Sequence, residues 1–216
     1  MASGTGCGFV DDVVFAGVAP PGLESQKKSW CYQERDEAER AAWAKALEAV
    51  AVCDRVDVDE TGCDDRLQRE YGWSVRGEHC VDKRVGHARE RVSVVAAWPL
   101  KVDRPAQSDK TAGAGLIAPL SFRGTCHSRL FELWLRVMLC PLLRAGQVVI
   151  LDNARFHRKH AVQRILRRVG CRALFLPAYS PDLNVIETQW HRFKTRVCAY
   201  RLQGLELMPA VNEALL

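Results

Sequence analysis

The sequence predicts an α/β fold with a mixed five-stranded sheet, in which three antiparallel strands come first, parallel strands follow, and helices flank the sheet. Two observations support this fold class. Residues 91–98 are rich in β-branched side chains, as strands are. Residues 148–151 form an uninterrupted apolar run, which is typical of a strand buried on both faces of a partly parallel sheet.

Two segments precede the sheet. Residues 1–30 contain Gly, Pro and Ser without a clear period and are expected to form an irregular N-terminal lead-in. Residues 31–52 are expected to form a linker helix, because four apolar side chains recur there at helical spacing. These side chains are Trp43, Ala46, Leu47 and Val50.

The main domain is expected to span residues 53–202, and residues 203–216 are expected to form a C-terminal tail. Its first strand runs from residue 53 to Asp59, and Gly62 is expected to end it. The later strands are predicted at 91–98, 115–122, 148–151 and 172–176, and the helices at 128–143, 160–169 and 184–200. The last helix has Asn184 as its expected N-cap.

Composition places the chain among ordinary globular proteins, with 48% hydrophobic and 26% charged residues in a length of 216. The nine cysteines are scattered and form no C-x-x-C pair, which favours reduced thiols and a cytoplasmic location over a disulfide framework. No apolar run is long enough to cross a bilayer, so no membrane partner is expected.

Positive charge is concentrated in residues 152–201, where eleven Lys and Arg stand against three acidic residues, while the whole chain carries a net charge of +5. Such a segment attracts a polyanion such as DNA. A set of solvated helix faces is the plainer alternative. The candidate DNA contacts are Arg76, Arg155, His157, Arg158, Lys159, Arg192, Lys194 and Arg196.

Three acidic residues are candidate metal ligands. Asp59 and Asp152 each follow an apolar run, and Glu187 falls in the first turn of a predicted helix. Three carboxylates gathered by a fold are suited to a site that binds two Mg²⁺ or Mn²⁺ ions for phosphoryl transfer. Each also has a structural reading: Asp59 and Asp152 as turn residues, with Glu60 a competing ligand beside Asp59, and Glu187 as a helix-capping residue.

Three motifs together resemble the catalytic core of mariner-like DDE transposases, and most closely their bacterial insertion-sequence branch. The motifs are Asp-Glu-Thr-Gly at 59–62, Leu-Asp-Asn-Ala-Arg-Phe-His at 151–157, and the stretch from Leu174 to Glu187 that contains Ser-Pro-Asp-Leu-Asn-Val-Ile-Glu. The resemblance implies a ribonuclease H-like fold and Mg²⁺ or Mn²⁺ as cofactor, with Asp59, Asp152 and Glu187 as catalytic ligands. It also implies DNA as partner, both transposon ends and target, and a homodimer.

Three departures from that family accompany the match. Val185 replaces a proline at the start of the last helix, and Asp57 stands where an apolar strand residue is expected. The residues before the sheet offer one helix and no room for the helix-turn-helix domains of such transposases, so the chain is expected to be a catalytic part without them.

The predicted function is therefore metal-dependent cleavage of DNA at insertion-sequence ends, followed by strand transfer to target DNA. Two alternatives stay open. The chain could be a nuclease of the same fold with no role in transposition, or an inactive remnant that only binds DNA or oligomerises.

Overall fold

The structure, a computed structural model, describes residues 32–69, 73–81, 83, 86–100 and 115–216. The chain divides into two units, Met1–Gln33 and Glu34–Leu216. The predicted lead-in at 1–30 lies outside the described residues.

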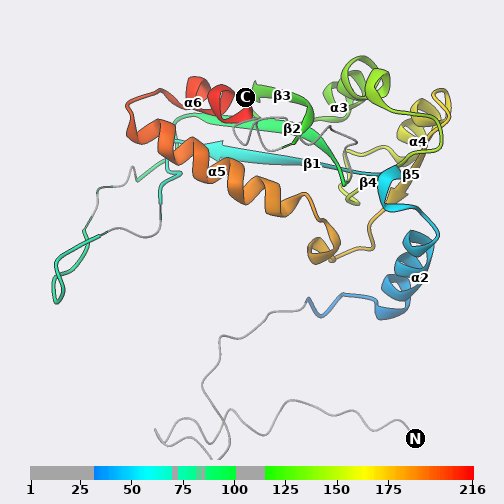
Figure 1. The fold of residues 1–216 in the computed structure, drawn as a ribbon, viewed down its shortest axis with the longest axis horizontal. Helices are drawn as coiled ribbons and strands as arrows, with labels where there is room; N and C mark the ends of the chain where they lie inside the picture. The colour runs from blue at the N-terminus through cyan, green and yellow to red at the C-terminus, as the bar shows by residue number, and fades with distance from the viewer. Residues whose placement is uncertain (1–31, 70–72, 82, 84–85, 101–114) are drawn as a thin grey trace, which may run out of the picture. The chain divides into compact units, whose positions relative to one another are not determined.

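A five-stranded mixed sheet forms the centre of the second unit, with the strand order β3-β2-β1-β4-β5 (Figure 1). Strands β1, β2 and β3 pair antiparallel, whereas β4 and β5 continue the sheet on the other side of β1 in parallel. The strands are β1 Arg55–Asp64, β2 Arg91–Pro99, β3 Ile117–Arg123, β4 Val148–Leu151 and β5 Arg172–Phe175. This arrangement confirms the predicted mixed sheet.

Helices cover both faces of the sheet. The α-helices are α2 Glu37–Glu48, α3 Ser128–Trp134, α4 Lys159–Arg167, α5 Glu187–Leu202 and α6 Leu207–Leu215. Short turns complete the set: η1 Val52–Asp54, the π-helical η2 Leu135–Leu139, η3 Cys140–Leu142 and η4 Pro181–Leu183. The single predicted helix at 128–143 is thus three consecutive pieces. Among the described residues no helix is long and apolar enough to span a membrane.

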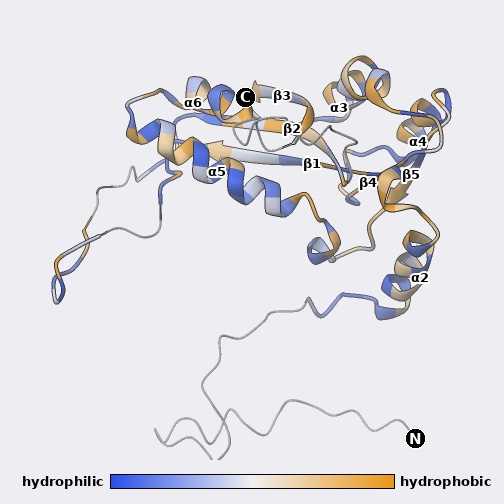
Figure 2. Cartoon of the chain, viewed as in Figure 1, coloured by the Kyte–Doolittle hydropathy of each residue, from blue (hydrophilic) through white to orange (hydrophobic). Residues whose placement is uncertain are grey.

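Alternation along β1 assigns its side chains to two different cores. Val56 and Val58 pack with α3, η2 and α4 on one face. Cys63 lies on the opposite face, in a cluster formed mainly by α5 and α6, and a third cluster joins α2 to β4. Because successive strand residues point to opposite faces, Asp57 and Asp59 share the face of Cys63. Figure 2 shows the mixture of polar and apolar residues around α5 that this half-buried position requires.

The sequence prediction for the end of β1 was wrong. Gly62 does not end β1, which continues to Asp64, and Gly62 pairs with Ser93 in the ladder with β2. The expected tail at 203–216 contains helix α6, which packs on α5 and the sheet. Its buried residues recur at helical spacing, a pattern already visible in the sequence. They are Leu207, Ala210, Val211 and Ala214.

Asp57 is the one acid in β1 that the core encloses completely, with none of its surface exposed. Neither carboxylate oxygen has a hydrogen-bond partner in the part of the chain that the structure describes. Burial raises the pKa of Asp57 from 3.8 to about 7, and attraction to Arg55 offsets only part of this effect. The folded chain therefore holds this proton more tightly than the unfolded chain does, and stability falls as the pH rises from 3.8 through about 7.

Replacing this acid should stabilise the protein. We expect Asp57→Val to raise the free energy of unfolding by about 2–4 kcal/mol at pH 8, because a buried charge without partners is removed and a β-branched residue takes its place. Denaturant unfolding in a chelating buffer at pH 4 and pH 8 measures this, and the gain should shrink at pH 4. A variant that is destabilised at pH 8 would show that Asp57 has a stabilising partner in the folded chain.

Candidate active site

Asp59 and Asp152 lie next to each other because of the register between β1 and β4. Val58 pairs with Leu151 in parallel orientation, and each aspartate is the next residue of its chain. Residues in matching register of parallel strands point to the same face. The two carboxylates therefore come from adjacent strands at the carboxyl end of β4, where α/β sheets bind their ligands.

The carboxylate of Asp59 is held in place by two donors. The indole N–H of Trp190 donates to Oδ2 at 3.1 Å, and the backbone N–H of Glu60 donates to Oδ1 at 2.8 Å. The residue is only 8% exposed. Burial raises the pKa of Asp59 to about 7, and repulsion from Glu60, Glu187 and Asp152 adds to the rise. Three other carboxylates thus act on Asp59, and two of them contact His157.

Glu187 is the first residue of α5, the helix that supplies Trp190. Its side chain is exposed, and its negative charge reaches Asp59. The expected N-cap is not formed: Ile186 occupies that position without a side-chain hydrogen bond, and the amide oxygen of Asn184 has no partner among the described residues. Glu187 therefore does not complete a capping box with Asn184, and its carboxylate is free of that role.

The turn before α5 is fastened to α2. Arg40 donates from both terminal nitrogens to the two oxygens of Asp182, at 3.1 and 2.7 Å, and this guanidinium lowers the pKa of Asp182. Leu183 packs in the cluster that includes Trp43 of α2. The turn η4 is thereby held on two sides, which limits where Glu187 can lie.

His157 joins Asp152 to Glu60. Its Nδ1 lies 2.8 Å from Oδ1 of Asp152, and its Nε2 lies 3.0 Å from Oε1 of Glu60. The ring is buried between Phe131 and Phe156, with centroids 4.2 Å from each. Burial alone would lower the pKa of His157, but the two carboxylates raise it to about 9, so the ring is a cation at neutral pH.

The same contact governs Asp152. Burial would raise the pKa of Asp152, but the hydrogen bond and charge of His157 and the backbone N–H of Ala154 lower it below its usual value. Asp59 and Asp152 thus lie side by side with pKa values shifted in opposite directions. Such pKa shifts are typical of active sites, where burial and neighbouring charges adjust the protonation state of each group for its role.

In their present orientations, Asp59, Asp152 and Glu187 do not form a complete metal-binding site. Among the described residues, no group of three or more His, Cys, Asp or Glu side chains is arranged to hold a metal ion. The donor chemistry nevertheless fits a divalent cation, since carboxylate oxygens are its preferred ligands and the charges of Glu187 and Asp152 both act on Asp59. Turning the Asp152 carboxylate away from His157 would be part of completing the site.

Comparison with known families agrees with this geometry. The sequence profile described as "DDE superfamily endonuclease" matches residues 54–205, more than half of the chain. The chain belongs to the DDE superfamily endonucleases. Among curated proteins, none matches the sequence.

Solved structures of Mos1 transposase share the fold of this DDE domain. The Mos1 strand transfer complex has a TM-score of 0.56 at 14% identity, covering 94% of this chain and 66% of that chain. The pre-cleavage Mos1 transpososome gives 0.55 at 13% identity, with 90% and 64% covered. The Mos1 paired-end complex with the left transposon end gives 0.54 at 15% identity, with 82% and 54% covered.

The DDE domain therefore has a ribonuclease H-like fold, as the motifs implied. At these identities the likeness concerns the fold alone. The chain spans between 54% and 66% of the length of these Mos1 chains. Its resemblance to mariner-like transposases thus extends from the motifs to the arrangement of strands and helices.

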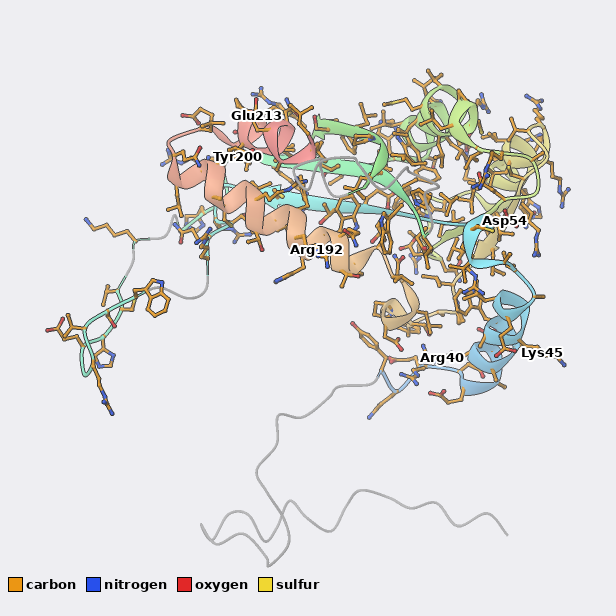
Figure 3. The ribbon with its side chains drawn as sticks, in the orientation of Figure 1. Arg40, Lys45, Asp54, Arg192, Tyr200 and Glu213 are labelled. Carbon is orange, nitrogen blue, oxygen red and sulfur yellow. The ribbon has the colours of Figure 1, made fainter. Side chains whose placement is uncertain are left out.

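The candidate DNA contacts of the DDE domain fall into two groups. Arg76, Arg155 and Arg192 are exposed, and Arg192 projects from α5 in Figure 3. Three others already have partners: Arg158 donates to Glu132 at 2.7 Å, Arg196 donates to the carbonyl of Ala214, and Lys159 lies over the ring of Phe175. Lys194 is half-buried.

The prediction for His157 as a phosphate contact does not fit this structure. The side chain is 1% exposed, so a phosphate cannot reach it without a rearrangement. Its position between two carboxylates identifies it as a positioning residue for Asp152. The sequence singled out Glu60 as a competing ligand but did not reveal its contact with His157, and it did not reveal Trp190 as a donor to Asp59. The alternation of β1 was the only sequence signal that could have directed Glu60 to the His157 face.

The charged His157 bridge gives a pH-dependent contribution to stability. Since its folded pKa is about 9 and the usual value is 6.5, the contribution is complete below pH 6.5 and is lost as the pH rises toward 9. We expect His157→Gln to be less stable by about 2–3 kcal/mol at pH 6.5, with the gap closing near pH 9. Denaturant unfolding across this range provides the measurement. His160→Gln on the exposed face of α4 is the control, and an unchanging gap for His157→Gln would contradict the bridge.

Proposed function

We propose that this chain is the catalytic domain of a DNA transposase of the mariner-like type, from the bacterial insertion-sequence branch. Its reaction is hydrolytic cleavage of phosphodiester bonds at the ends of the element, followed by transfer of the freed 3′ end to target DNA. A homodimer acting on DNA is part of this proposal.

One observation carries the proposal: the β1–β4 register places Asp59 beside Asp152, and α5 brings the charge of Glu187 to the same place. A polyanionic substrate is not expected to approach three carboxylates unless cations neutralise them. Mos1 structures described as paired-end complexes with Mn and with Mg support the choice of metal. Asp59, Asp152 and Glu187 are the residues that would hold two such ions.

When bound, two divalent cations supply activation of the attacking oxygen and neutralisation of the leaving oxygen. The chain supplies the orientation of the ligands. Trp190 and the Glu60 N–H hold both oxygens of Asp59 in place. The Asp152 carboxylate pairs with His157 and would exchange this contact for the ion. Asp59 must also release its proton, whose pKa is about 7, so that ligand binding by this carboxylate strengthens as the pH rises to neutrality.

The decisive test is removal of one carboxylate. We expect Asp152→Asn to lower Mg²⁺-dependent cleavage of element-end DNA by at least about 100-fold, because the amide cannot neutralise a cation, while folding is preserved. Asp54→Asn is the matched control: it lies in η1, before β1, and should cleave normally. Full cleavage by Asp152→Asn would contradict the assignment.

Two further measurements separate the alternatives. A nuclease without a role in transposition would cut DNA but would not join pre-cleaved ends to a target duplex. An inactive remnant would keep its fold and fail to bind Mn²⁺ at the three carboxylates.

A further inference from the structure

Helix α4 presents a row of basic side chains that the proposed active site does not use. His160, Arg164, Arg167 and Arg168 line one shallow hollow of the surface. They follow each other at intervals of four, three and one residues, so they extend along about 12 Å of the helix. We call these four residues the α4 basic row.

The buried face of α4 determines which side of the protein the α4 basic row lies on. Ala161, Val162, Ile165 and Leu166 are buried, and three of them pack in the core cluster that contains Val58. The basic side chains alternate with these apolar residues and are exposed. They lie on a helix that covers the Val58 face of the sheet, whereas Asp59 belongs to the opposite face. The row therefore lies on the other side of the sheet from Asp59.

The row has no acidic partners within the described part of the chain. Residues 158–172 contain no Asp or Glu at all. Other basic side chains of the protein do have them: Arg40 pairs with Asp182, Arg158 with Glu132 and Arg66 with Asp64. Like charges at helical spacing repel each other, as between Arg164 and Arg168, so the free protein bears a cost that a bound polyanion would relieve.

The chemistry of the row matches phosphate groups in a line. Guanidinium groups bind phosphate through paired N–H donors, and three of the four side chains are arginines. A length of about 12 Å corresponds to roughly three phosphates along one strand of a duplex. The charges are ordered along the rigid axis of a helix, which suits a regular phosphate backbone better than a flexible acidic peptide.

We propose that the α4 basic row binds the phosphate backbone of duplex DNA, at a site distinct from the catalytic carboxylates and independent of base sequence. This proposal rests on the proposed function in taking DNA as the partner. Its test does not require catalysis, so the two can fail separately.

The experiment compares two double variants with the same loss of charge. Arg164→Gln/Arg167→Gln removes two members of the row, and Lys45→Gln/Arg129→Gln removes two exposed charges from α2 and α3. Binding of a random-sequence DNA duplex is measured in a chelating buffer by fluorescence anisotropy over a range of salt concentrations. Circular dichroism confirms that each variant is folded.

The expected result is a decrease of about two in the slope of log affinity against log salt for the row variant, with at least about tenfold weaker binding at low salt. The control should keep the slope of the unaltered chain. Arg164→Lys/Arg167→Lys should also keep it, since the charge is retained. The row variant could lose DNA binding while the unaltered chain shows no metal-dependent cleavage. That combination would support the DNA site on α4 and reject the proposed function.

Two outcomes would overturn the α4 site. One is an equal effect of the row and control variants on the salt slope. The other is poly-glutamate binding as tight as that of DNA and equally sensitive to Arg164→Gln/Arg167→Gln, which would assign the row to an acidic polypeptide instead.

Discussion

The parallel pairing of β1 with β4 is the constraint on which the candidate active site depends. Shifting this register by one residue would turn one aspartate to the opposite face of the sheet, into the core formed by α3 and α4. The register is itself fixed by apolar residues, since Val56 and Val58 fill one core while Val148 and Ile150 fill another. The placement of Asp59 beside Asp152 is thus a result of hydrophobic burial.

Two buried carboxylates in β1 reduce the stability of the fold when they are ionised. Asp57 and Asp59 lie on the same face, and burial raises the pKa of both to about 7. Asp59 has two hydrogen-bond donors, whereas Asp57 has none in the described chain. The large apolar clusters around α5 and α6 offset such costs, which shows why the C-terminal helix belongs to the fold.

The order of strands and helices could be predicted from the sequence, because period-two runs and helical apolar stripes are local properties. The motifs single out Asp59, Asp152 and Glu187, and the structure bears on them only through the β1–β4 register and the charge of Glu187. The sequence did not reveal that Gly62 continues β1 beside β2, since that depends on a partner strand thirty residues away. Nor did it reveal that His157 is buried between Phe131 and Phe156, because such long-range packing leaves no local pattern.

The pairing of Arg40 with Asp182 links α2 mechanically to the third acid. Asp182 precedes Glu187 by one short turn, and α2 also packs against β4 through Trp43 and Leu47. A displacement of α2 would consequently change the position of Asp182 and with it the position of Glu187, the first residue of α5. The position of Glu187 is therefore set in part by a helix whose Arg40 lies 142 residues before Asp182 in the chain.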